Sequence, residues 1–292
     1  MSSQIITTID TLQFGLPQTG AVYLVKGSCP ALLESGTASS VPRILDVLHR
    51  GGQRGGSIRP RFIFLTHIHL DHAGGAGYLA RAFPDARIVV HERGTRHLAD
   101  PRQLVEGVRA AAPDMYRLYG SPLPVPDRQL IAVSGGEIFE LGLDIRLEVI
   151  ASPGHAPHHV CYYEHRDRTL FTGDAVGNWN SAVDVPLTVP PHFSLARGLE
   201  TLQTLNRLAP DCLAFTHFGL TTDALGQLQR YEVRLKAWFE EIQTLAASLQ
   251  PEDVVQHIVA RPQYERLSET ERRMVGMCVR GAILSLPSER IE

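Results

Sequence analysis

The stretch Thr66-His67-Ile68-His69-Leu70-Asp71-His72 places three histidines and an aspartate within six positions. It follows Arg61-Phe62-Ile63-Phe64-Leu65, a run without polar alternation that predicts a strand buried on both faces. Open α/β sheets bind their ligands just beyond the ends of such strands. Imidazole and carboxylate groups gathered there predict a metal site, with ligands that suit zinc and also iron or manganese.

Four neighbouring ligands cannot all reach one ion without strain, so we expect a second ion and further ligands downstream. Three residues qualify, each directly after a β-type run: His155, Asp174 and His217. Taken singly, each has an ordinary explanation as a turn residue or a hydrogen-bonded histidine. Their order after the first motif favours one shared site. The predicted metal ligands are therefore His67, His69, Asp71, His72, His155, Asp174 and His217.

Strand-type and helix-type segments both occur throughout the first 220 residues, a pattern typical of α/β layers. The segment 101–120 is ambiguous, and we expect it to be helical. The expected strands are 5–9, 21–25, 31–34, 61–66, 87–91, 129–133, 144–150, 160–163, 169–172 and 212–216, and the expected helices are 41–50, 78–83 and 194–208.

Four short motifs in fixed order resemble those of the metallo-β-lactamase superfamily, especially its glyoxalase II-like and lactonase-like branches. They are T-H-x-H-x-D-H-x-G-G at 66–75, P-G-H at 153–155, T-G-D at 172–174 and T-H at 216–217. The resemblance implies a four-layer αβ/βα sandwich with two metals at one edge of its sheets. It implies that His67, His69 and His155 hold the first metal, that Asp71, His72 and His217 hold the second, and that Asp174 bridges them.

Two departures from the family pattern bear on the substrate. The chain reads Pro153-Gly-His155-Ala-Pro-His158-His159, where P-G-H-T-P-G-H is common. His159 matches the second histidine of that motif and is interpreted as a partner behind the ligands. His158 replaces a glycine, as a substrate contact or, the interpretation we favour, as a solvated loop residue. The last motif lacks the H-E-Y-T of glyoxalase II proper, which argues against glutathione thioesters.

The resemblance implies a dinuclear hydrolase in which a metal-bridging hydroxide attacks an ester, lactone or thioester. Asp71 is the predicted catalytic residue, orienting the hydroxide and passing a proton to the leaving group. Two alternatives stay open: a nuclease or phosphodiesterase of the same fold, and a mononuclear-iron persulfide dioxygenase. The net charge of −3, from 28 basic and 31 acidic residues, favours a small-molecule substrate over nucleic acid.

The chain after residue 220 has a different pattern, an apolar stripe with steps of three and four that predicts one long helix. The stripe packs against its own domain, which we favour, or forms a homodimer through the C-terminal helices. A further helix is expected at 268–286. We divide the chain into a catalytic domain at 1–220 and a helical extension at 221–292. The stripe consists of Leu228, Tyr231, Leu235, Trp238, Ile242, Leu245 and Leu249.

The remaining composition excludes several classes of protein. The four cysteines lie far apart without a C-x-x-C pair, so neither a disulfide framework nor a cysteine-type zinc site is expected. No apolar run approaches about 18 residues, so no membrane span is expected. The first residues lack a basic segment followed by an apolar one, and we expect a cytoplasmic protein.

Overall fold

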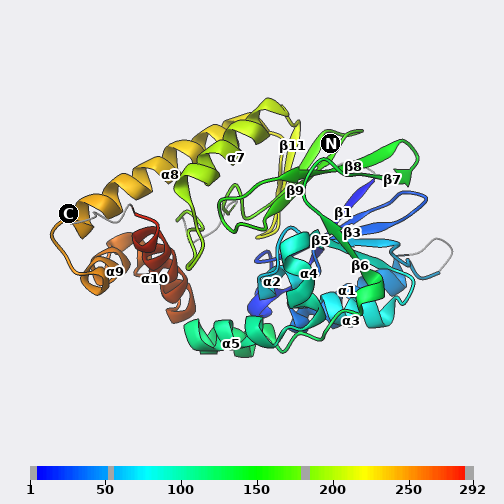
Figure 1. Ribbon diagram of the computed structural model, residues 1–292, viewed down its shortest axis with the longest axis horizontal. Helices are drawn as coiled ribbons and strands as arrows, with labels where there is room; N and C mark the ends of the chain where they lie inside the picture. Colours follow the sequence, from blue (N-terminus) through cyan, green and yellow to red (C-terminus); the bar gives the residue numbers. More distant parts are fainter. Residues whose placement is uncertain (1–4, 52–55, 179–184, 287–292) are drawn as a thin grey trace.

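Two six-stranded mixed sheets lie face to face, and helices cover the outer face of each (Figure 1). The structure is a computed structural model that describes residues 5–51, 56–178 and 185–286. The order helix, sheet, sheet, helix confirms the predicted αβ/βα sandwich. Within the described residues, no helix combines the length and the apolar character needed to cross a membrane.

The first sheet has the order β1-β2-β3-β4-β5-β6. Its first three strands are antiparallel and the others are parallel to β3, as expected for strands joined by helical crossovers. The strands are β1 (Ile6–Asp10), β2 (Ala21–Val25), β3 (Ala31–Leu33), β4 (Phe62–Phe64), β5 (Arg87–His91) and β6 (Leu130–Val133).

The second sheet has the order β12-β11-β10-β9-β8-β7. All its neighbouring strands are antiparallel except β10 and β11, which are parallel. Strands β8, β10 and β11 therefore run in one direction and end at one edge. The strands are β7 (Ile138–Gly142), β8 (Ile145–Ala151), β9 (Val160–Glu164), β10 (Thr169–Gly173), β11 (Cys212–Phe215) and β12 (Leu220–Thr221).

The helices agree with the sequence pattern, except that one expected helix is divided and some short elements were not predicted. The expected helix at 101–120 divides before Pro113, because proline lacks an N–H and disfavours helical backbone in Ala112. Helices α2, α4 and α9 were not predicted, and neither were strands β7 and β12. The helices are α1 (Val41–Arg50), α2 (Leu70–Ala73), α3 (Ala76–Ala82), α4 (Glu92–Ala99), α5 (Arg102–Ala111), α6 (Pro113–Tyr119), α7 (Leu195–Arg207), α8 (Ala224–Ala246), α9 (Pro251–Val259) and α10 (Glu269–Leu284).

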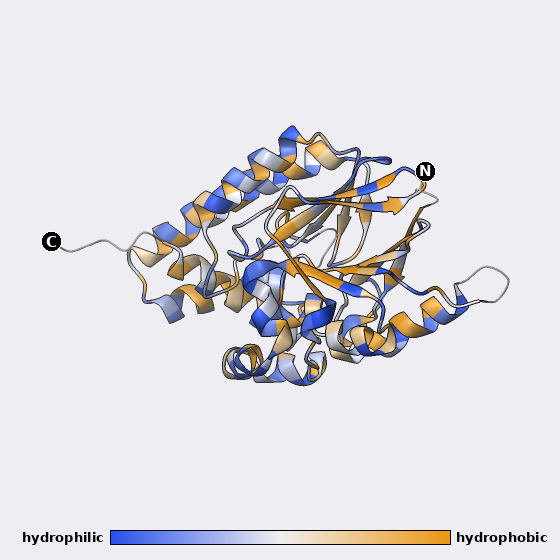
Figure 2. Ribbon diagram, turned by 45° about the vertical axis from the view of Figure 1, so that its right-hand side comes forward, coloured by the Kyte–Doolittle hydropathy of each residue, from blue (hydrophilic) through white to orange (hydrophobic). Residues whose placement is uncertain are grey.

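Apolar side chains fill the space between the sheets and beneath the helices on both sides. Between the sheets, aromatic rings meet edge to face, with centroids 5.5 Å apart for Tyr23 and Phe171 and 5.2 Å apart for Phe64 and Tyr162. Figure 2 shows apolar strands at the centre and helices with mixed polar and apolar faces. Burial on both sides makes each sheet a rigid platform for the loops at its edge.

The C-terminal helices pack on the second sheet of their own chain. Leu228, Leu235 and Trp238 of α8 are buried in the same apolar core as Leu170 and Leu213 of the sheet. In Figure 1, α8 runs beside α7 and leads to α9 and α10. The predicted stripe is thus covered within the chain, as favoured. All four cysteines are free, as expected.

Candidate metal centre

All seven predicted ligands come together where the strands of the two sheets end. His67, His69 and the following Asp71 and His72 lie in the loop after β4 and in the short helix α2. The other three follow the ends of β8, β10 and β11, which share one edge of the second sheet. They are His155, Asp174 and His217.

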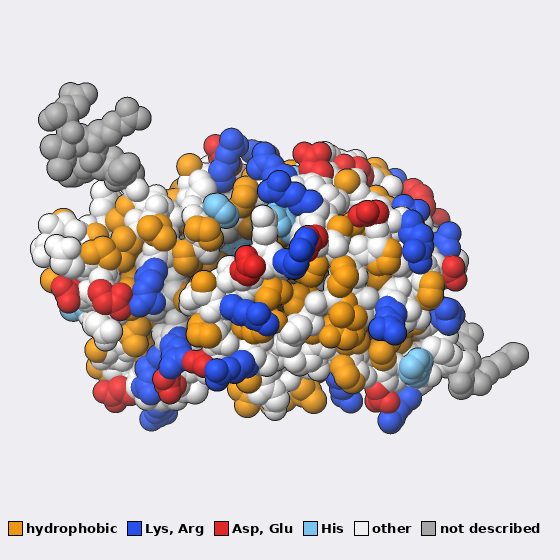
Figure 3. Space-filling view, turned by 60° about the horizontal axis from the view of Figure 1, so that its bottom comes forward, with side chains coloured by type: hydrophobic (Ala, Val, Ile, Leu, Met, Phe, Trp, Pro, Cys, Tyr) orange, Lys and Arg blue, Asp and Glu red, His pale blue; other side chains and the backbone are white. Residues whose placement is uncertain are grey.

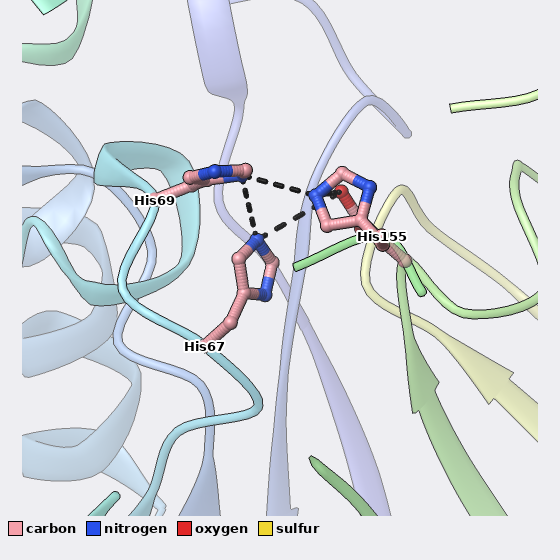
Figure 4. Close-up of side chains that lie close together, drawn as sticks. His67, His69 and His155 are labelled. Carbon is pink, nitrogen blue, oxygen red and sulfur yellow. Dashed lines mark hydrogen bonds and ion pairs between the residues drawn. The ribbon is translucent and has the colours of Figure 1, made fainter. Parts of the chain in front are cut away.

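A first ligand set consists of His67, His69, His155 and one oxygen of Asp174, and its ligand atoms lie within 4.8 Å of one another. His69 Nδ1 is 2.9 Å from His67 Nε2 and 3.1 Å from His155 Nε2. Asp174 Oδ2 is 3.3 Å from His155 Nε2 and 4.0 Å from His67 Nε2. Figure 4 shows the three imidazoles pointing toward a common point.

A second ligand set consists of Asp71, His72 and His217, whose ligand atoms also lie within 4.8 Å of one another. Asp71 Oδ2 is 3.8 Å from His72 Nε2 and 3.9 Å from His217 Nε2. The other oxygen of Asp174, Oδ1, is 3.2 Å from His72 Nε2 and 3.3 Å from His217 Nε2. Asp174 therefore presents one carboxylate oxygen to each set.

Two properties of the ligand atoms fit metal ions: their spacing, and the lack of hydrogen-bond partners for two of them among the described residues. Two ligand atoms about 2.1 Å from a common ion in tetrahedral geometry lie about 3.4 Å apart, close to the separations found here. Among the described residues, His72 Nε2 and Asp174 Oδ1 are buried with no hydrogen-bond partner. Buried polar atoms in folded proteins nearly always have a partner, and a bound cation satisfies both atoms at once.

Glu34 holds the imidazole of His72 from behind. Its Oε1 accepts a hydrogen bond from His72 Nδ1 at 3.0 Å and others from the hydroxyls of Thr66 and Thr216. This leaves Nε2 of His72 facing the site as an electron-pair donor. Glu34 was not predicted from the sequence. The signal that could have found it is an acidic residue directly after the apolar run 31–33, where only a paired carboxylate is tolerated.

His155 is oriented by the backbone of a loop that the C-terminal helices hold. Its Nδ1 lies 2.8 Å from the carbonyl oxygen of Leu187, so Nδ1 carries the proton and Nε2 faces the site. The next residue, Thr188, donates its hydroxyl to the carbonyl of Cys278 in α10 at 2.6 Å. That hydroxyl also accepts from the indole of Trp238 in α8 at 3.2 Å. The extension thereby supports a predicted ligand of the first set.

His159 lies behind Asp174, as its match to the second histidine of the family motif predicted. Its Nε2 accepts the backbone N–H of Asp174 at 3.1 Å, which leaves Nδ1–H to donate to Ser152 Oγ at 2.8 Å. The close approach depends on Gly173, whose φ is +49°. A Cβ there would lie 2.5 Å from His159 Nε2 and 2.7 Å from Thr66 Oγ1.

The two ligand sets differ in their electrostatics. Burial, together with neighbouring imidazoles, lowers the pKa of the histidines of the first set, which are therefore neutral and ready to bind a cation. Burial also opposes charge on His72 and His217, but the carboxylates of Asp174 and Asp71 outweigh it and raise the pKa of both. Burial would raise the pKa of Asp174, yet the surrounding histidines, His72 first, lower it well below its usual range.

A cavity of about 820 Å³ opens beside His69. Its wall includes His158, which is half-buried rather than a solvated loop residue and accepts the N–H of Ile68 at 3.4 Å. Burial and the neighbouring His155 lower the pKa of His158 to about 4, so it is neutral. Helix α4, the start of α5 and residues 191–192 form the rest of the wall.

The sequence model of the metallo-beta-lactamase superfamily matches residues 15–217, which include every ligand described above. The chain belongs to the metallo-beta-lactamase superfamily. The match is to the superfamily as a whole, so the glyoxalase II-like or lactonase-like branch stays a prediction. Family membership and the ligand set support the prediction of a metal-dependent hydrolase.

Relatives agree with this assignment over most of the chain. The metallo-beta-lactamase fold-containing protein ST1585 of Sulfurisphaera tokodaii is 30% identical over 213 residues, covering 70% of this chain and 75% of that protein. Its crystal structure superposes with a TM-score of 0.71 at 23% identity, over 96% of this chain and 99% of that one. TTHA1429 of Thermus thermophilus, a metallo-beta-lactamase family protein, gives 0.71 at 20% identity, over 97% and 93%.

Several relatives have an activity in their names. The atrochrysone carboxyl ACP thioesterase AgnL7 of Paecilomyces divaricatus is 33% identical over 129 residues, which is 44% of this chain and 31% of that protein. The match therefore spans less than a third of the thioesterase.

Proposed function

We propose that this protein hydrolyses an ester, lactone or thioester of a small molecule, with two divalent metal ions held by the seven ligands. The observation that carries the proposal is the position of Asp174. Its Oδ2 lies 3.3 Å from His155 Nε2 in the first set, and its Oδ1 lies 3.2 Å from His72 Nε2 in the second. A carboxylate shared in this way joins two metal sites into one centre. Thioesterases among the relatives support carbonyl chemistry.

The ligand chemistry favours zinc, with iron or manganese as alternatives. When bound, such ions lower the pKa of water toward neutrality and stabilise negative charge on a carbonyl oxygen. His67, His69 and His155 would hold the first ion with their neutral imidazoles, and Asp71, His72 and His217 would hold the second. Asp174 would contribute one carboxylate oxygen to each ion, and His159 and Glu34 keep these side chains in place through the hydrogen bonds described above.

Asp71 is the proposed proton carrier. Its side chain is 15% exposed, more than that of any other carboxylate of the centre, so it is the carboxylate most accessible to water and substrate. In this role the carboxylate of Asp71 orients the attacking water, accepts a proton from it and passes that proton to the departing oxygen or sulfur. The buried Asp174 stays ionised, because its lowered pKa keeps the proton off, and cannot serve in that role.

Metal analysis of the purified protein tests the proposal first, together with a screen of lactones, thioesters and phosphodiesters. About two ions per chain and carbonyl hydrolysis are expected. Phosphodiester cleavage would favour the nuclease, although the net charge of −3 offers little attraction to nucleic acid. A single iron with oxygen uptake on persulfides would favour the dioxygenase.

Asp174→Ala tests the bridge directly. The variant should lose the second ion and turnover together, because one carboxylate serves both sets. Asp211→Ala is the matched control, since Asp211 forms an exposed ion pair with Arg168 and does not belong to the centre. A variant of Asp174 that retained two metals and full activity would contradict the bridging role.

A further inference from the structure

Two arginines line the cavity beside His69, and neither of them forms an ion pair with a described carboxylate. Arg93 and Arg96 both come from α4 and form no ion pair with any described residue. The neighbouring Arg102 and Arg197, by contrast, pair with Asp100 and Glu200. Figure 3 shows a hollow on one face of the molecule with histidine and with lysine or arginine side chains around it. The cavity therefore carries unpaired positive charge next to a predicted metal ligand.

The position of α4 directs this charge toward the centre. Residues 93, 96 and 97 are three and four positions apart and share one face of the helix, which lines the cavity. On the other side, Gly94 is buried so close to Ile68 that an added Cβ would lie 2.8 Å from that side chain. Ile68 is the residue between the ligands His67 and His69. The helix therefore has a fixed position relative to the metal ligands.

His97 adds hydrogen-bonding capacity to the cavity rather than charge. Burial, with a contribution from Arg96, lowers the pKa of His97, and its Nε2 accepts a hydrogen bond from Arg96 Nε at 3.1 Å. That bond holds the guanidinium of Arg96 and leaves its terminal nitrogens available. His192 lies in the cavity wall contributed by residues 191–192. Glu92 is the one acidic side chain among the described lining residues, set against two arginines.

We propose that Arg93 and Arg96 bind an anionic group, a carboxylate or a phosphate, on the substrate whose carbonyl lies at the metal centre. Guanidinium groups bind both anions through paired hydrogen bonds. The apolar side chains of Ile68, Leu104 and Pro157 in the same wall suit a carbon skeleton between the two groups. This inference rests on the proposed hydrolase function and narrows its substrates to acidic esters or thioesters.

Two matched substrate pairs test the proposal and locate the charge. p-Nitrophenyl butyrate and mono-p-nitrophenyl succinate differ by a carboxylate on the acyl side. S-butyryl pantetheine and its 4′-phosphate differ by a phosphate on the leaving group. We expect the anionic member of one pair to have the higher kcat/KM by about tenfold or more. The pair that shows the preference identifies which part of the substrate carries the anion.

The variant Arg93→Met/Arg96→Met keeps the apolar stems and removes both charges. It should abolish that preference, so that the charged and neutral members of each pair have kcat/KM values within about twofold of each other in the variant. Arg207→Met is the control, since Arg207 is in α7 and does not line the cavity. Equal rates for charged and neutral members in the wild type, or a preference that survives the double substitution, would overturn the proposal.

Equilibrium binding separates this proposal from the hydrolase function itself. Titration of the metal-loaded protein with succinate and with 4′-phosphopantetheine should show binding of at least one, weakened about tenfold in the double variant. Anions that bind only at the metals would bind the double variant equally well, and that result would refute the arginine site. If no ester is cleaved but this difference is found, the hydrolase function fails while the anion site stands.

Discussion

Glu34 Oε1 lies 3.0 Å from Nδ1 of His72, and both side chains are almost completely buried. The carboxylate also accepts hydrogen bonds from the backbone N–H and the hydroxyl of Thr66, so few of its lone pairs are free. A buried acid with this many partners has one orientation, and it gives the imidazole one orientation as well. The pair is thus a positioning device for the second ligand set.

Glu34→Gln should weaken metal binding by about 10- to 100-fold, because an amide can no longer hold the imidazole as a charged acceptor does. Competition with a chromogenic chelator measures the change. Glu148→Gln is the matched control, since Glu148 forms a similar pair with His165 at 2.9 Å but lies apart from the centre. Unchanged affinity in Glu34→Gln would show that the other contacts suffice to hold His72.

Gly173→Ala should destabilise the protein by about 1–3 kcal/mol and lower metal affinity. The new methyl group would push against His159, whose Nε2 holds the backbone of Asp174, and φ at this position is +49°. Thermal unfolding with and without metal measures both effects. Gly107→Ala in α5 has no atom within 4 Å of its Cβ and should stabilise that helix by about 1 kcal/mol. Equal behaviour of the two variants would contradict the steric argument.

Thr188→Val should lower stability by about 1–3 kcal/mol, because the carbonyl of Cys278 and the indole of Trp238 each lose a buried partner. We also expect weaker binding of the first metal, since Leu187 would no longer be held against His155. Thr204→Val is a control whose hydroxyl bonds only within the exposed surface of α7. Loss of stability without any change in metal affinity would confine Thr188 to a packing role.

Acid should remove metal from the second set before the first. In the metal-free protein the raised pKa values of His72 and His217 keep protons on both rings at higher pH than usual, and a metal must displace those protons. The pKa values of the first set are lowered, so its imidazoles are already neutral. Metal content measured between about pH 8 and pH 5.5 should fall in two steps. Simultaneous loss of both ions would show that the sets do not titrate separately.

The sequence predicted what is local and missed what depends on distant contacts. Strands 21–25 and 87–91 match to the residue, because a short apolar run between turns specifies a buried strand. The seven predicted ligands could be named because each belongs to a short motif, and the structure brings them together. Glu34 was missed because its role depends on His72 and on Thr216, 182 positions away.

Two other features had no signal in the sequence that could have been used. The support of His155 comes from a backbone carbonyl at Leu187, which any side chain at that position would leave unchanged. Helix α4 is largely polar on its exposed side, so its pattern resembled a loop, and its arginines gained meaning only once Gly94 placed the helix against Ile68. Both depend on tertiary packing, which local pattern does not encode.

The hydrogen bonds of Thr188 connect the last helices to the loop that orients His155, and we therefore expect those helices to influence metal affinity. A substitution deep in α8 or α10 could present as a cofactor defect, although it alters none of the seven ligands. Exchange of the C-terminal helices between relatives would then change the metal affinity of the centre without altering its ligand motifs. The sequence pattern changes at residue 220, but the support of His155 extends across that position. We therefore expect a chain truncated there to lose binding of the first metal.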